Sequence, residues 1–238
     1  ASTFNLTKNP EVHISFKGCK PQIIFVKNIL SVGIPSIIMS SVGSAMTFGM
    51  NKILITFSST AVAVFGVYFK LNSFVFMPVF GLNNGMVPIV SYNYGAQNKK
   101  RLTKTIKLAI MYAVCIMFIG IMLFQFIPDV LLKLFDASDH MLEIGIPALR
   151  VISLSFAFAG ICIVISSSLQ ALGHGFLSMM ISITRQLIIL LPSAYILAKF
   201  GGIHAVWWSF NIAEIGSLTL SLLFFKHMYN KIIKHLGE

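Results

Sequence analysis

The chain has 238 residues, of which 56% are hydrophobic and only 11% are charged, and its formal net charge is +11. A soluble domain could not hide that much apolar surface, so the composition indicates a membrane protein. The basic residues lie mainly at the ends of apolar segments, as they do in membrane proteins. The positive charge therefore does not indicate binding to nucleic acid.

Sequence motifs for catalysis or metal binding are absent. The three cysteines, Cys19, Cys115 and Cys162, have no paired spacing and therefore imply neither a disulfide framework nor a metal site. There is no metalloprotease, nucleophile-elbow or phosphate-loop motif, and the six histidines lie at segment ends or in tails. We therefore expect no enzyme activity and no cofactor.

The N-terminal region is polar and lacks the apolar core of a signal peptide. We interpret residues 1–26 as a cytoplasmic linker between lobes, ending in an amphipathic lead-in. Residues 27–238 are predicted to form a transmembrane lobe with a short basic cytoplasmic tail.

Six stretches are long and apolar enough to form membrane-spanning helices, which need about 20 residues each. Pro35 is expected to kink the first, and the second is longer than one straight crossing requires. Proline and glycine within the second also predict interrupted backbone that must line protein or a water-filled cavity. The expected spans are 29–55, 60–90, 108–127, 142–172, 176–200 and 203–225.

Lysine and arginine are unevenly distributed between alternate loops. Most of them lie in the N-terminal segment, the loop after the second span and the C-terminal tail, whereas the opposite loops contain only Lys52, Lys133 and Lys199. Because cytoplasmic loops are enriched in basic residues, both termini are predicted to be cytoplasmic in a multi-pass plasma-membrane protein surrounded by lipid bilayer.

Ionisable side chains near the bilayer centre are costly and are candidates for function. Lys70, Arg185 and Glu214 lie near the middle of their spans, and Glu214 is the only acid at such depth. Polar and aromatic residues three or four positions apart lie on the same helix face as Glu214. Other spans carry rows of polar residues at the same spacing. The candidate substrate- or ion-binding residues are Glu214, Arg185, Lys70, Asn72, Met77, Asn83, Ser40, Gln170, Phe210 and Asn211.

Two structural alternatives remain open for these residues. Small hydroxylated residues at helical spacing also allow membrane helices to approach closely. Glu214 could form a structural ion pair with Arg185 or Lys70, and that role can coexist with binding.

The string MPVFGLNNGMVPIVSYNYGAQNKKR, residues 77–101, carries a family resemblance. It resembles the signature of multidrug and toxic compound extrusion (MATE) transporters. Further matching residues are Gly33-Ile34-Pro35, Gln170-Ala171-Leu172-Gly173, Arg185-Gln186, Pro192, Gly202, Trp207 and Glu214. Members of that family have twelve spanning helices in two lobes. The resemblance therefore implies an all-α membrane protein in which a six-transmembrane-helix bundle forms the C-terminal lobe and an N-terminal six-helix lobe is its partner.

The resemblance also implies export of small organic cations and other amphiphiles by H+ or Na+ antiport through alternating access. Glu214 could then exchange a proton for a cationic cargo. The first and fourth spans lack the interior acids of Vibrio-type members, so the chain looks more like the branch of DinF proteins and staphylococcal exporters. A membrane binding or structural module, or a flippase of lipid-linked sugars from the same superfamily, is the alternative.

Overall fold

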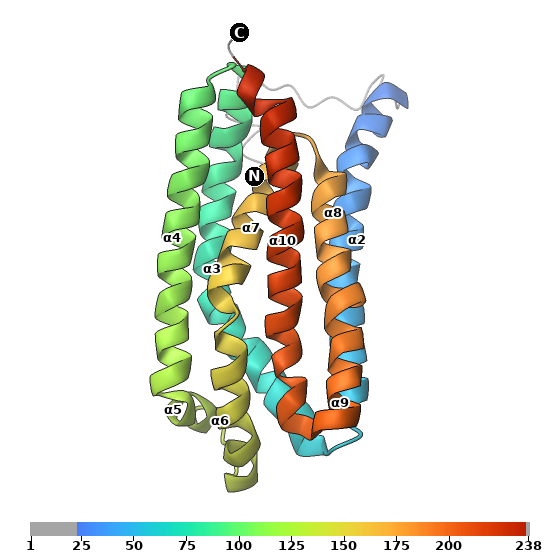
Figure 1. The fold of residues 1–238 in the computed structure, drawn as a ribbon, viewed down its shortest axis with the longest axis vertical. Coiled ribbons are helices and arrows are strands. Elements are labelled where there is room, and N and C mark those ends of the chain that lie inside the picture. The colour runs from blue at the N-terminus through green and yellow to red at the C-terminus, as the bar shows by residue number, and fades with distance from the viewer. Residues whose placement is uncertain (1–22, 237–238) are drawn as a thin grey trace, which may run out of the picture. The chain divides into compact units, whose positions relative to one another are not determined.

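The computed structural model describes residues 23–236, which are helical and include no β-strand. All six predicted spans coincide with helical elements (Figure 1). The predictions for residues 1–22, including most of the linker, lie outside the described residues. In chain order, the elements are α2 (Ile23–Leu54), α3 (Ser59–Gly95), α4 (Lys99–Phe126), α5 (Pro128–Lys133), α6 (Asp139–Ser153), α7 (Phe156–Ala171), α8 (Gly175–Ile183), the π-helix η1 (Thr184–Leu190), α9 (Leu191–Val206), α10 (Trp208–Lys231) and the short 3₁₀-helix η2 (Ile233–His235).

The chain divides into two compact units, Ala1–Ile34 and Pro35–Glu238. The described part of the first unit is the beginning of α2, residues 23–34. The second unit contains the remainder of α2 and every later element. The boundary predicted at residue 27 stays a prediction.

Several of these elements have the dimensions of membrane spans. Within residues 23–236, α3, α4, the continuous α8–η1–α9 run and α10 are long and apolar enough to cross a bilayer. The bent pair α6–α7 provides a fifth span when its two helices are counted as one. The remaining long helix, α2, has 32 residues.

The longest element, α3, is a continuous helix of 37 residues. The Ser58 side chain caps its start by accepting a hydrogen bond from the backbone N–H of Ala61 at 3.0 Å. Pro78 and Pro88 lie inside the helix without ending it, so the interruption predicted from the sequence is wrong. At about 1.5 Å per residue, α3 is longer than the roughly 30 Å hydrocarbon core, which agrees with the expected tilt or projection.

The fourth predicted span is bent by 50° between α6 and α7. A break frees backbone carbonyl groups, and carbonyls buried without partners are destabilising. Side chains supply the missing donors here. Gln125 donates to the Arg150 carbonyl at 2.8 Å, Asn211 to Val151 at 2.9 Å, and Ser155 to Ile152 at 2.7 Å. The bend is thus held by residues of α4 and α10 as well as by its own serine.

Packing within the second unit centres on α4, α7 and α10. α4 lies against α3 and α7, and α10 lies against α7 and the η1–α9 run. A Cβ atom at Gly160 of α7 would lie 2.9 Å from Cγ of Met117 and 3.5 Å from the Ala113 carbonyl oxygen, both on α4. Only a residue without a side chain allows this close approach. Nearby, the rings of Phe124 and Phe156 meet edge to face with centroids 5.2 Å apart.

Candidate functional site: a polar cavity around an ion pair

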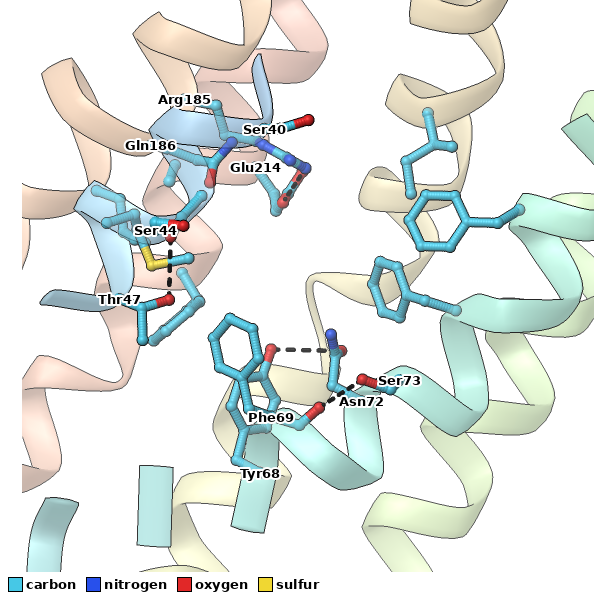
Figure 2. A pocket seen from close by; sticks show the side chains of 18 residues that line it. Ser40, Ser44, Thr47, Tyr68, Phe69, Asn72, Ser73, Arg185, Gln186 and Glu214 are labelled. Atoms are coloured by element: carbon cyan, nitrogen blue, oxygen red, sulfur yellow. Dashed lines mark hydrogen bonds and ion pairs between the residues drawn. The ribbon is translucent and has the colours of Figure 1, made fainter. Parts of the chain in front are cut away.

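A cavity of about 510 Å³ opens between α2, α3, α7, η1 and α10, and all of its lining residues belong to the second unit (Figure 2). Its polar lining consists of Ser40, Ser44, Thr47, Tyr68, Asn72, Ser73, Arg185, Gln186 and Glu214. Its aromatic wall consists of Phe69, Phe76, Phe80 and Phe210, together with the Tyr68 ring. Polar groups on an otherwise apolar wall are typical of sites for small ligands.

The charged groups of the cavity form an ion pair. Nη1 of Arg185 donates to Oε1 of Glu214 at 3.0 Å, and the two side chains are 26% and 13% exposed. The second carboxylate oxygen of Glu214, Oε2, is buried and has no hydrogen-bond partner within residues 23–236. The lining therefore has no formal net charge, and one oxygen of its carboxylate is buried without a partner among the described residues.

The π-helix η1 determines where Arg185 and Gln186 point. η1 occupies seven residues between α8 and α9, and α9 begins with Pro192 in its first turn. Such wide turns are rare and are often found at functional sites. Figure 2 shows both side chains directed from this segment toward the cavity, with the Arg185 guanidinium meeting Glu214 of α10. The sequence did not predict the π-helix.

The hydroxyl groups of the cavity present acceptor lone pairs. Ser40, Thr47 and Ser73 each donate their hydroxyl proton to the carbonyl four residues earlier in the same helix, at 3.1, 3.0 and 2.9 Å. A hydroxyl that has donated its single proton can only accept further bonds. Tyr68 in turn donates to Oδ1 of Asn72 at 3.4 Å and packs edge to face on Phe210, with ring centroids 5.6 Å apart. A ligand that donates hydrogen bonds fits this lining.

The cavity brings together half of the candidates predicted from sequence. The lining includes Glu214, Arg185, Asn72, Ser40 and Phe210. The Arg185–Glu214 ion pair, expected as a structural alternative, is present and faces the cavity. Involvement of these residues in binding stays a prediction.

The other five candidates lie elsewhere. Lys70 is exposed, with Nζ 5.6 Å from the Phe135 ring centroid, and Met77 is also exposed. Asn83 is buried in α3, and neither its amide nitrogen nor its oxygen has a partner in the described part of the chain. The side chains of Gln170 and Asn211 are engaged in hydrogen bonds within the protein. Gln170 donates to the sulfur of Met39 at 3.9 Å, and Asn211 donates to the Val151 carbonyl at the α6–α7 bend.

Apart from Phe210, the aromatic wall of the cavity was missed, and its remaining rings all belong to α3. Tyr68 and Asn72, Phe69 and Ser73, and Phe76 and Phe80 are pairs four residues apart on α3. Residues at this spacing are neighbours on one helix face. The spacing was visible in the sequence and could have identified this wall. Within residues 23–236, no group of three or more histidine, cysteine or acidic residues could hold a metal ion.

The fold and the cavity define one helical lobe of a polytopic membrane protein with an internal polar site. Residues 35–196 match the family described as MatE. The chain belongs to the MatE family, as its sequence resemblance predicted, and the all-α lobe architecture is confirmed.

Relatives in this family are multidrug export proteins by name. The chain is 26% identical over 230 residues to multidrug export protein MepA of Staphylococcus haemolyticus (strain JCSC1435), covering 94% of this chain and 49% of the relative. It is 31% identical over 209 residues to MepA of Staphylococcus aureus (strain MSSA476), covering 87% and 46%. The chain thus spans about half the length of these relatives.

Solved structures show the same fold. The outward-facing conformation of a multidrug resistance MATE family transporter of the MOP superfamily matches with a TM-score of 0.88. That match is 22% identical and covers 98% of this chain and 53% of the transporter. An inward-facing conformation of such a transporter matches with a TM-score of 0.82, also at 22% identity, covering 98% and 55%.

Proposed function

We propose that this chain is one lobe of a secondary active multidrug exporter that expels organic cations and other amphiphiles in exchange for H+ or Na+. Family membership and the names of the relatives support this function. The half-length coverage supports a second, N-terminal lobe as the partner. Two lobes that rock against each other around a site near the membrane midplane would provide alternating access.

The observation that carries the proposal is the Arg185–Glu214 pair at the cavity wall. Glu214 offers one carboxylate oxygen to Arg185 and has a second with no partner in the described residues. A cationic cargo or a proton binding to Glu214 would compete with Arg185 for its charge. Arginine does not release its own proton. The guanidinium would therefore act as an internal counter-ion that pairs with Glu214 whenever neither a cargo nor a proton is bound.

The remaining lining suits the apolar and polar parts of such a cargo. The rings of Phe69, Phe76 and Phe210 provide aromatic faces, to which a cationic group is attracted. The acceptor oxygens of Ser40 and Ser73 would take hydrogen bonds from an ammonium or amide group. An amphiphilic cation therefore satisfies both kinds of wall.

The proposed arrangement in the cell follows the distribution of basic residues. The turn between α3 and α4 and the end of α10 would lie on the cytoplasmic side of the plasma membrane. The opposite ends of the spans, near Lys52, Lys133 and Lys199, would face outward.

Dye efflux from vesicles containing the full-length protein tests the role of Glu214. Glu214→Gln keeps the shape of the side chain and one acceptor oxygen but removes the charge. We expect efflux to fall at least tenfold and to lose its dependence on the imposed pH or sodium gradient. Glu143→Gln removes an exposed acid of α6 and is the control. Unchanged rate and unchanged gradient dependence in Glu214→Gln would overturn the proposed role.

A second pair of variants tests whether this cavity is the site. Asn72 lines the cavity, whereas Lys70, two residues earlier, is exposed beside Phe135. We expect Asn72→Leu to lower dye efflux severalfold and Lys70→Gln to leave it near the parent rate. If Lys70→Gln lowered dye efflux and Asn72→Leu did not, the substrate site would have to lie on the other face of α3.

A further inference from the structure

One face of α4 changes from charged to apolar along its length. Each of Lys100, Lys104, Lys107, Leu108 and Met111 lies three or four residues from another member of the set, which places them on one face of the helix. All five are exposed. Together with Lys99 and Thr103, they line a groove of about 700 Å³, which we call the α4 groove.

The lysines of the α4 groove have no acidic partner among the described residues. The ion pairs in residues 23–236 are Arg185–Glu214 and His140–Glu143. Apart from Glu214, the acids of this range lie after the far end of α4, in α5, α6 and the turn between them. The positive charge of the groove is thus not neutralised within the described structure.

The end of the chain adds basic charge at the same place. Nζ of Lys99 donates to the backbone carbonyl of Lys234 at 2.6 Å. This contact holds the segment after α10, with the exposed side chain of Lys234, beside the start of α4, and α10 itself ends at the exposed Lys231. Figure 1 shows the end of α10 at the end of the bundle where α3 passes into α4.

The order of the groups along the groove matches that of a phospholipid. From Lys100 to Met111 the helix advances about 16 Å at 1.5 Å per residue. Charge occupies the end where α4 begins, and the apolar side chains of Leu108 and Met111 follow in the direction of the membrane interior. Clusters of basic residues at the end of a spanning helix bind acidic lipid headgroups.

We propose that the α4 groove binds an anionic phospholipid, with its phosphate among Lys100, Lys104 and Lys107 and an acyl chain along Leu108 and Met111. A zwitterionic lipid would bring its own cationic group against the lysines and would bind less well. A soluble phosphate or a nucleic acid would leave the apolar half of the groove unused. The proposal does not depend on what the cavity transports.

Lipid binding is tested on the full-length protein by native mass spectrometry, with phosphatidylglycerol and phosphatidylcholine as the two probes. We expect the parent protein to retain phosphatidylglycerol in preference. Replacing Lys100, Lys104 and Lys107 with glutamine should weaken phosphatidylglycerol binding roughly tenfold or more and leave phosphatidylcholine binding unchanged. Lys52, Lys133 and Lys199 replaced together by glutamine remove the same charge from other turns and should retain the preference.

Two further measurements keep the test decisive. If the triple variant does not fold, Lys104→Gln alone should still weaken phosphatidylglycerol binding severalfold. Glycerol phosphate, which has the headgroup chemistry without acyl chains, should not displace the lipid at equal concentration. The proposal fails if glycerol phosphate competes equally, if the control variant loses as much binding as the groove variant, or if both lipids bind alike.

Discussion

The Arg185–Glu214 pair should contribute measurably to stability, because each group is largely removed from water. Replacing either with methionine leaves the other without its partner at 3.0 Å. Glu214 is the less exposed side chain, at 13% against 26% for Arg185. A lone carboxylate at that site is harder to solvate than a lone guanidinium that can extend into the cavity. Arg185→Met should therefore destabilise the protein more than Glu214→Met.

The expected magnitude lies between two limits. Breaking a fully buried pair costs about 3–5 kcal/mol, whereas a fully exposed pair contributes about 0–1 kcal/mol. This pair lines a cavity that admits water, so about 2 kcal/mol is expected for Arg185→Met. For a chain of this length, that corresponds to a fall of about 4–8 °C in melting temperature. The double variant should recover at least half of the loss, since no lone charge remains.

Thermal unfolding in detergent, followed by intrinsic fluorescence, measures all four proteins of this cycle. Glu143→Met is the matched control, because its pair with His140 has side chains that are 62% and 78% exposed and should change stability little. Strictly additive single and double variants would show that the two groups do not interact. A double variant less stable than either single variant would refute the desolvation argument.

Two other substitutions test how the helices are held. Asn211→Ala removes the donor to a carbonyl at the α6–α7 bend and should destabilise the protein by about 1–2 kcal/mol. The melting temperature should fall accordingly, whereas Asn230→Ala, at an exposed position of the same helix, should leave it unchanged. Gly160→Val inserts a side chain where α7 meets α4 and should destabilise by about 1–3 kcal/mol; a stable variant with unchanged far-ultraviolet circular dichroism would show that this contact is looser than described.

The fold could be predicted from the sequence because hydrophobic length is the dominant signal in a membrane protein. Each long apolar stretch had to become a helix that satisfies its own backbone. An ion pair of Glu214 with Arg185 or Lys70 was one of the alternatives drawn from the sequence, and Glu214 accepts a hydrogen bond from Arg185. The bend after α6 was not foreseen, because its stability depends on Gln125 and Asn211 from other helices, and sequence alone does not reveal that proximity.

Individual faces of helices were less predictable than the helices themselves. Lys70 and Asn72 were both candidates, yet residues two apart in a helix point about 200° apart. Only Asn72 lines the cavity. Once either was placed, the other should have been assigned to the opposite face. Helical spacing places Asn211 on the same face as Glu214, but its amide donates to a backbone carbonyl. Composition and spacing could not distinguish that outcome from ligand binding.

The π-helix makes the ion pair depend on residue count as well as residue identity. Each of its hydrogen bonds spans one residue more than those of an α-helix. The winding of Thr184–Leu190 therefore determines how the side chains of α8 and η1 are rotated relative to those of α9. Winding the same residues as an ordinary α-helix, with none deleted, would turn Arg185 by about 100° relative to α9. The guanidinium would then point away from Glu214, although neither charged residue had been altered.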